Sequence, residues 1–191
     1  ERSSALERSV LRVLAVEREP MTLGELIADL SPRVARGALL EVVEALRRRS
    51  LVERAETAGP TAFTLQSVVL EYVTDRLIEE VRDEIVGGQP RQLVDQPLIK
   101  ARAKEYVRQG QERLIGQPIL QRLAGQHAQH GTEQRLLALL HGWRAGSEVE
   151  QGYGPGNVVN LLRLLRADLR GLDLAGLSLR QAYLAGVEAQ D

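Results

Sequence analysis

The sequence predicts a mainly α-helical chain with one small β-ribbon near its start and a five-residue repeat at its end. Apolar residues recur at helical spacing through most of residues 1–166. Two short runs rich in strand-forming residues flank Gly59-Pro60. From Ala167 to Asp191, small or apolar residues return every five positions, a period that neither a helix nor a strand has. These observations divide the chain into residues 1–67, 68–153 and 154–191.

Residues 1–67 are predicted to form three helices and then a two-stranded ribbon. The apolar stripes are Leu6, Val10, Val13 and Leu14; then Leu23, Leu26, Ile27 and Leu30; then Leu39, Val42, Val43 and Leu46. Thr22-x-x-Glu25 is a capping box that starts the second helix. Residues 51–54 and 61–65 read as the strands. Three helices followed by a ribbon is the winged-helix arrangement, so we predict a winged helix here.

Residues 68–153 are predicted to be a helical bundle. Its first helix runs from Val68 to about Ile85 and stops at Gly87-Gly88. Its expected buried positions are Val69, Tyr72, Val73, Leu77 and Val81. Two or three helices follow between residues 91 and 124, with breaks expected at Pro97 and at Gly116-Gln117-Pro118. Further helices are predicted from a cap at Thr132, with the stripe Leu136, Leu139, Leu140 and Trp143, and from a capping box at Ser147-x-x-Glu150.

Residues 154–191 are predicted to begin with an apolar helix and end in a short coil of repeats. The helix follows the turn Gly152–Gly156 and carries the stripe Val158, Leu161, Leu162 and Leu165. Two positions of each pentad are small or apolar: Leu169, Leu174, Leu179, Leu184 and Ala189, and Ala167, Leu172, Leu177, Ala182 and Val187. We expect these side chains to face inward in a pentapeptide-repeat-like β-coil that turns a corner every five residues.

Composition excludes several classes of function. The net charge is −1, and residues 1–66 carry ten basic and ten acidic side chains, unlike the basic footprint of a strong nucleic-acid binder. There is no cysteine for a disulfide or a thiolate metal site. No apolar run approaches the roughly 20 residues that cross a bilayer. We therefore expect a cytoplasmic chain with no membrane partner.

No catalytic or metal site is predicted. A phosphate-binding loop needs Gly-x-x-x-x-Gly-Lys-Ser/Thr, and the only lysines, Lys100 and Lys104, lie outside any such pattern. Gly152-x-Gly-x-Gly156 follows no strand and precedes no suitable basic residue. Near the three histidines, His127, His130 and His141, no carboxylate or cysteine completes a ligand set. The expectation is a chain that is not an enzyme and holds no cofactor of its own.

DNA binding is the first alternative, because the third helix of a winged helix often enters the major groove. The available cations are Arg33, Arg36, Arg47, Arg48 and Arg49. The N-terminal half of this helix is mostly small and apolar, whereas base readout needs polar side chains there. The ribbon carries Glu53 and Glu56, which DNA phosphates repel. Nucleic acid is therefore a disfavoured partner, and a DNA-binding regulator stays open as the alternative.

The segment that runs from Gly152 to Leu174, GYGPGNVVNLLRLLRADLRGLDL, resembles bacterial STAND signalling NTPases. In that family an NB-ARC or NACHT-like ATPase precedes a winged helix, a helical region, a pentapeptide-like stretch and a WD-repeat propeller. The resemblance implies an upstream nucleotide-binding domain that binds ADP or ATP and a downstream propeller in the same polypeptide. The family's winged helix ends near a Met-His-Asp motif whose His contacts ADP. The matching positions here are Leu65, Gln66 and Ser67, with Gln66 in place of the His.

The function expected from this resemblance is regulatory. Such a segment couples the nucleotide-binding domain to the sensor propeller and supports self-association as a homo-oligomer. Hinge rotation is expected at Gly87-Gly88, Gly116 and Gly152. The second alternative is a passive helical scaffold that only spaces two domains.

Overall fold

The structure is a computed structural model that describes residues 4–30, 34–55, 59–125 and 129–184. The chain divides into two compact units, Glu1–Leu77 and Ile78–Asp191, and the division falls within one helix, α4. The predicted mainly α class is confirmed, since the described residues are mostly helical with one small sheet. The predicted boundaries after residues 67 and 153 stay predictions.

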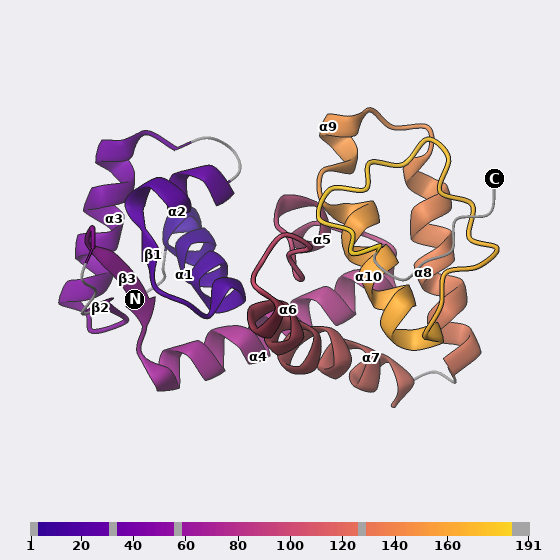
Figure 1. Cartoon of the computed structure of the whole chain (residues 1–191), viewed down its shortest axis with the longest axis horizontal. Helices are drawn as coiled ribbons and strands as arrows, with labels where there is room; N and C mark the ends of the chain where they lie inside the picture. The colour runs from indigo at the N-terminus through magenta and orange to yellow at the C-terminus, as the bar shows by residue number, and fades with distance from the viewer. Residues whose placement is uncertain (1–3, 31–33, 56–58, 126–128, 185–191) are drawn as a thin grey trace. The chain divides into compact units, whose positions relative to one another are not determined.

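Unit 1 contains three helices, a small sheet and the first half of α4 (Figure 1). Its elements are α1 (Ala5–Glu17), β1 (Met21–Thr22), α2 (Leu23–Asp29), α3 (Arg36–Arg48), β2 (Val52–Ala55), β3 (Ala62–Leu65) and α4 (Ser67–Gly87). The Thr22–Glu25 capping box is confirmed, and Ser4 with Glu7 forms a second one at α1. The side chains in each box satisfy backbone amides that the first helical turn leaves unpaired.

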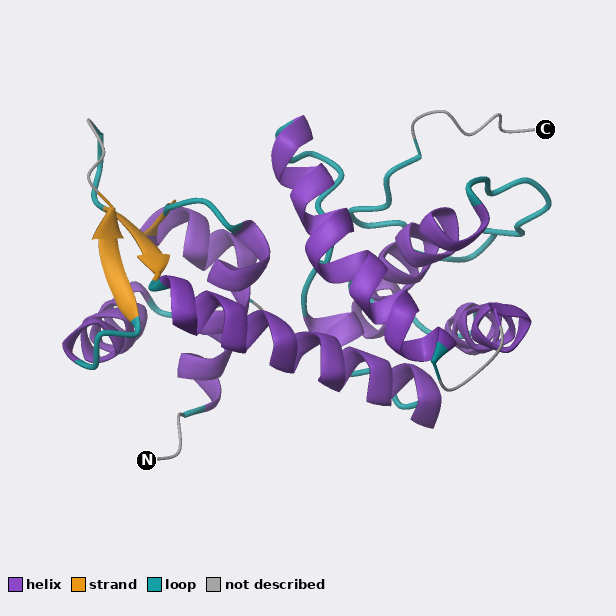
Figure 2. Ribbon diagram, turned by 90° about the horizontal axis from the view of Figure 1, so that it is seen from below, coloured by secondary structure: helices purple, strands orange, loops and turns teal. Residues whose placement is uncertain are grey.

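The sheet has three antiparallel strands in the order β1-β3-β2, one more than the predicted ribbon (orange in Figure 2). β1 pairs Met21 with Phe63, and β2 pairs Val52 with Leu65. A two-residue strand is too short to show an alternating pattern, so the sequence gives no periodic signal for β1. Within the described residues, all three strands belong to unit 1.

The core of unit 1 joins the three predicted stripes to the sheet and to α4. Leu26, Leu39, Val43 and Leu46 are fully buried together with Phe63. The expected inward position of Tyr72 in α4 is wrong, because this side chain is 70% exposed. The predicted burial of Val73, Leu77 and Val81 is confirmed. With Ile85 they form a line at four-residue spacing, and Tyr72 falls one position off that line.

Unit 2 is built from short helices around one central helix. Its elements after α4 are α5 (Gln92–Asp95), α6 (Glu105–Gln111), the π-helix η1 (Glu112–Gly116), α7 (Gln117–Ala124), α8 (Gln129–Trp143), α9 (Glu148–Gln151) and α10 (Gly154–Arg166). The stop at Gly87-Gly88 is confirmed, with Gly88 at a positive φ of 65°. The capping box at Ser147 is confirmed as well.

Two boundary predictions in unit 2 are wrong. The expected break at Gly116-Gln117-Pro118 is a continuous path from α6 through η1 into α7. A proline ring clashes with the preceding turn of an α-helix, and the wider π-turn accommodates Pro118 without ending the helix. The expected cap at Thr132 is also wrong, because α8 already includes Gln129 and Thr132 is 1% exposed inside the helix.

The C-terminal repeats form a series of turns, here called the pentad segment and defined as residues 167–184. Leu172, Leu177 and Ala182 each donate a backbone hydrogen bond to the residue three positions earlier. These turns recur every five residues, as the sequence period does. No strand occurs within the pentad segment, and the pentapeptide-repeat-like β-coil stays a prediction. Positions 185–191, including Val187 and Ala189, lie outside the described residues.

Candidate functional site

The most constrained part of unit 2 is the segment from Gln151 to Asn160, which we call the clamp. It comprises the end of α9 and the first half of α10. Every residue from Gly154 to Leu162 is buried, although the predicted stripe covers only one side of that helix. α10 packs against both α8 and α5. Because nearly its whole circumference is covered, the polar groups of this helix must find partners inside the protein.

The two asparagines of the chain, Asn157 and Asn160, both lie in the clamp and are 2% and 0% exposed. The Asn157 amide donates to the carbonyl oxygens of Leu93 and Gln96, at 2.8 Å each. Its oxygen accepts from the Leu98 backbone N–H at 2.8 Å. Asn157 thereby fixes the chain that leaves α5.

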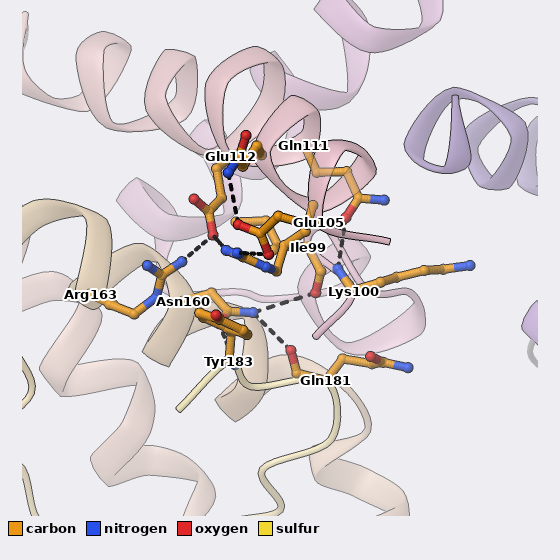
Figure 3. Close-up of polar contacts among 11 residues, drawn as sticks. Ile99, Lys100, Glu105, Gln111, Glu112, Asn160, Arg163, Gln181 and Tyr183 are labelled. Carbon is orange, nitrogen blue, oxygen red and sulfur yellow. Dashed lines mark hydrogen bonds and ion pairs between the residues drawn. The ribbon is translucent and has the colours of Figure 1, made fainter. Parts of the chain in front are cut away.

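Asn160 joins the α5–α6 connection, residues 96–104, to the pentad segment (Figure 3). Its amide donates to the Gln181 carbonyl oxygen at 2.9 Å and, more weakly, to that of Ile99 at 3.4 Å. Its oxygen accepts from the Tyr183 backbone N–H at 2.8 Å. One turn of α10 therefore holds the α5–α6 connection and the last described pentad turn together.

Gln151 holds an earlier pentad turn in the same way. Its amide donates to the carbonyl oxygens of Trp143, Gly146 and Gly176, at 3.1, 2.9 and 3.0 Å. Its oxygen accepts from the Ser178 backbone N–H at 2.6 Å. Figure 1 shows the pentad segment, in yellow, running beside α9 and α10. The segment has no strand partner, so these side-chain bonds supply its attachment.

Glycines in the clamp permit close backbone contacts. A Cβ on Gly156 would lie 2.0 Å from the Arg180 carbonyl oxygen, and one on Gly154 would lie 2.6 Å from the Trp143 ring. Gly152 has a φ of +51°, and a Cβ there would lie 2.4 Å from the Val94 carbonyl oxygen. The Gly-x-Gly-x-Gly pattern is thus explained by packing against protein atoms.

An ion-pair cluster supports the clamp from the side of α6 and η1 (Figure 3). The Arg108 guanidinium donates to Glu105 and Glu112, at 2.5 Å each, and Arg163 of α10 also donates to Glu112. The Arg108 guanidinium carbon lies 3.7 Å from the centre of the Tyr183 ring. This stacking gives the last pentad turn a second attachment.

The pKa values in this cluster follow from its pairing. Burial acts to lower the pKa of Arg108, but its hydrogen bonds and charge interactions with Glu105 and Glu112 outweigh burial and raise the pKa. Hydrogen bonds from Arg108 and then Gln109 lower the pKa of Glu105. Both shifts favour the charged forms, so the pair of Arg108 and Glu105 stays ionised at neutral pH.

The predicted nucleotide-sensing residues lie together at the end of β3, in unit 1. Leu65 is buried and pairs with Val52 of β2. Gln66 and Ser67 are exposed, and the Gln66 backbone N–H donates to the Leu51 carbonyl oxygen at 3.4 Å. Of the three, only Gln66 and Ser67 present side chains to solvent.

The candidate DNA-binding arginines do not gather in one patch. Arg36 begins α3, whereas Arg47, Arg48 and Arg49 lie at its other end, about 16 Å away along the helix axis. Arg47 pairs with Glu44 at 2.9 Å, and Arg49 pairs with Glu7 at 3.0 Å. Arg33 lies outside the described residues. The two pairs reduce the positive charge that this end of α3 offers to phosphates.

No group of metal-ligating side chains and no membrane-length apolar helix occurs within the described residues. His130 and His141 are both on α8, separated by 11 residues, or about 16 Å. His127 lies outside the described part of the chain.

The arrangement of the clamp suits mechanical attachment, since its polar atoms are directed at backbone groups.

Sequence reasoning missed the clamp, although a signal for it was present. Amide side chains at positions i and i+3 in an otherwise apolar helix are unusual, because a buried amide costs free energy unless it is hydrogen-bonded. Asn157 and Asn160 have this spacing, and they are the only asparagines in the chain. The pattern predicts two buried backbone segments as partners. Identifying those segments requires the tertiary structure.

Comparison with known proteins gives one informative relative. The chain is 36% identical over 225 aligned positions to an uncharacterized WD repeat-containing protein of Nostoc sp. (strain PCC 7120). The alignment includes the whole of this chain and 18% of the relative, so the chain spans less than a fifth of that protein's length. No protein-family model matches the chain, and no solved structure matches it.

Proposed function

We propose that this chain is a non-catalytic coupling segment of a STAND-type signalling ATPase of the cytoplasm. In this proposal, unit 1 is a winged-helix module beside an upstream nucleotide-binding domain, and the pentad segment is a pentapeptide-like coil that leads to a WD-repeat propeller. ADP or ATP belongs to the upstream domain. The order of helices and strands in unit 1 and the WD repeats of the Nostoc relative support this reading.

The observation that carries the proposal is the double attachment made by Asn160. A single side chain bonds the α5–α6 connection and the pentad segment. Displacement of the pentad segment by a downstream domain must therefore either move α10 with it or break these bonds. Coupling requires one element with two arrangements, and the domains on both sides of it must each favour one arrangement over the other.

Close contacts at two of the three expected hinge positions restrict where a hinge can lie. A Cβ added at Gly116 would lie 2.6 Å from the Leu164 side chain, and one added at Gly152 would lie 2.4 Å from the Val94 carbonyl oxygen. Gly87 and Gly88 have no atom within 4 Å of an added Cβ. We therefore retain only Gly87-Gly88 as the proposed hinge.

The first test is the size of the native protein. An antibody raised against residues 1–191 should detect one polypeptide several times heavier than the 21.1 kDa of this segment. A native product of that mass alone would contradict the proposal.

The second test compares nucleotide hydrolysis by the native polypeptide and by a version truncated after residue 184. Truncation should change the rate of ATP hydrolysis, and Asn160→Leu in the untruncated polypeptide should reproduce the change. Gln121→Leu, which replaces an exposed amide on α7, is the matched control and should leave the rate unaltered. ATP hydrolysis that is indifferent to both changes would favour the passive spacer, and tight duplex binding that depends on Arg36 would favour the DNA-binding regulator.

A further inference from the structure

A pocket of about 390 Å³ lies against the pentad segment in unit 2. Its walls come from three parts of the chain: Ala101 and Arg102 of the α5–α6 connection, Tyr153 before α10, and residues 179–182. The clamp holds these same parts together. The volume falls within the range of about 300–1,000 Å³ that is typical of small-molecule sites.

The pocket is positively charged. Among the described residues that line it, the two charged ones are Arg102 and Arg180, and none is a carboxylate. Arg180 is positioned by Tyr153, because its guanidinium carbon lies 4.5 Å from the ring centre and Nη2 lies 3.4 Å from the hydroxyl. Arg144 and Arg170, which are not among the lining residues, pair with Asp173 and Asp168. Arg102 and Arg180 form no ion pair with any described residue, so both guanidinium groups are available to an anion.

Gln181 adds a second feature that points to a ligand. Its backbone carbonyl oxygen is held by Asn160, but its side-chain Oε1 is buried without a hydrogen-bond partner among the described atoms. A buried acceptor without a donor is rare in proteins. Gln181 itself lines the pocket, where a ligand hydroxyl can donate to an amide oxygen.

We propose that this pocket binds a small phosphate monoester that carries a hydroxyl group. The phosphate oxygens would lie between Arg102 and Arg180, whose planar guanidinium groups suit a multivalent oxyanion. The hydroxyl would donate to Gln181 Oε1. Such a ligand would tie the α5–α6 connection to the pentad segment. This proposal requires neither an upstream ATPase nor a downstream propeller, so it is tested separately from the coupling role.

The experiment is calorimetric titration of the 191-residue chain with glycerol phosphate, and with sulfate as an oxyanion that has no hydroxyl. Glycerol phosphate should bind at one saturable site and more tightly than sulfate. Arg102→Gln and Arg180→Gln should each weaken binding about tenfold, the loss expected for one charge-assisted contact. Arg170→Gln removes the same charge two pentad turns earlier, outside the pocket, and should leave the affinity within about twofold, because salt screens an exposed charge that does not contact the ligand.

Gln181→Met tests the hydroxyl contact, since Met has a similar length and no strong acceptor. This variant should bind glycerol phosphate and sulfate equally. The proposal is overturned if the wild-type chain shows no saturable binding, or if Arg170→Gln weakens binding as much as the pocket variants. Tighter binding of an acidic peptide than of glycerol phosphate would also overturn it and assign the pocket to protein docking.

Discussion

Position 156 tolerates no side chain in this structure. The Arg180 carbonyl oxygen would lie only 2.0 Å from a Cβ there, and both partners are backbone. A flexible side chain can move away from an added methyl group, whereas a backbone carbonyl moves only with its turn. The same argument applies at Gly152, where the contact is the Val94 carbonyl oxygen and the φ is positive.

Gly156→Ala should therefore destabilise the chain by about 1–3 kcal/mol, the range for overpacking a filled site. Gly142→Ala is the matched control, because that glycine is also helical and has open space around it. Gly142 lies in the last turn of α8, so the control should stabilise the chain by no more than the roughly 0.5–1 kcal/mol gained in a helix interior. Urea unfolding monitored by circular dichroism measures both. Equal effects at the two positions would contradict the proposed close approach.

Asn157 presents a related test at the level of one atom. Its amide nitrogen donates to two carbonyl oxygens, and Asn157→Asp would replace that donor with a second acceptor at the same place. An unpaired buried charge costs about 3–5 kcal/mol, so we expect a loss of unfolding free energy of that order. The exposed change Gln121→Glu should alter stability by less than about 0.5 kcal/mol. A small effect of Asn157→Asp in the same urea titration would show that the amide contributes little.

The elements of unit 2 are joined by charges as well as by amides. α6, η1 and α10 meet at the ion pairs of Arg108, Glu112 and Arg163. The π-helix places Glu112 where it accepts from α6 and α10 together. Further from this cluster, the capping box with Ser147 lowers the pKa of Glu150 through its backbone and side-chain hydrogen bonds. The charged carboxylates of Glu150 and Glu105 thus hold the first turn of α9 and the first turn of α6 in place.

These lowered pKa values set the direction of the pH dependence. The folded-state pKa values of Glu105 and Glu150 lie below the ordinary value of 4.5, so the folded chain binds fewer protons than the unfolded chain as the pH falls. Their stabilisation is complete above about pH 4.5 and is lost as the pH falls through the folded pKa values. The thermal midpoint should fall in that window, less steeply in Glu105→Gln. A midpoint that does not change with acidification would contradict this.

The elements that could be predicted from the sequence are those that depend only on residues close together in the chain. Capping boxes and apolar stripes act within a few residues, so Thr22–Glu25 and the Leu39–Leu46 stripe were predictable. The path through Gly116 was not, because a wide helical turn and a glycine packed against Leu164 depend on α10, and Leu164 is 48 residues further along the chain. The clamp was not predicted for the same reason, since its hydrogen-bond partners lie in segments that are distant in sequence.

At the scale of the whole molecule, the chain contains two units, each with its own hydrophobic core. The cluster that includes Leu26, Leu39 and Leu46 belongs entirely to Glu1–Leu77, while α10 organises Ile78–Asp191. The helix α4 passes through the division without interruption. Stability is therefore expected to be local to each unit, apart from what the continuous helix transmits.

Leu46→Ala should remove about 2–5 kcal/mol from unit 1, the usual cost of truncating a fully buried leucine. Native-state hydrogen exchange should then show faster exchange in α1 and α3 and unchanged protection in α10. The converse variant, Leu161→Ala, should affect unit 2 in the same selective way, since Leu161 is also fully buried. Loss of protection in both units from either change would mean that they unfold as one.

The hydrogen bonds of Asn157 join residues that are 59 to 64 positions apart in the chain. During synthesis, the connection after α5 leaves the ribosome long before the amide that completes it. Unit 1 has all of its core by Val73 and can fold while translation continues. The remainder must wait until the pentad turns have emerged, so a nascent chain stalled between residues 100 and 150 would expose unfinished backbone to chaperones and proteases.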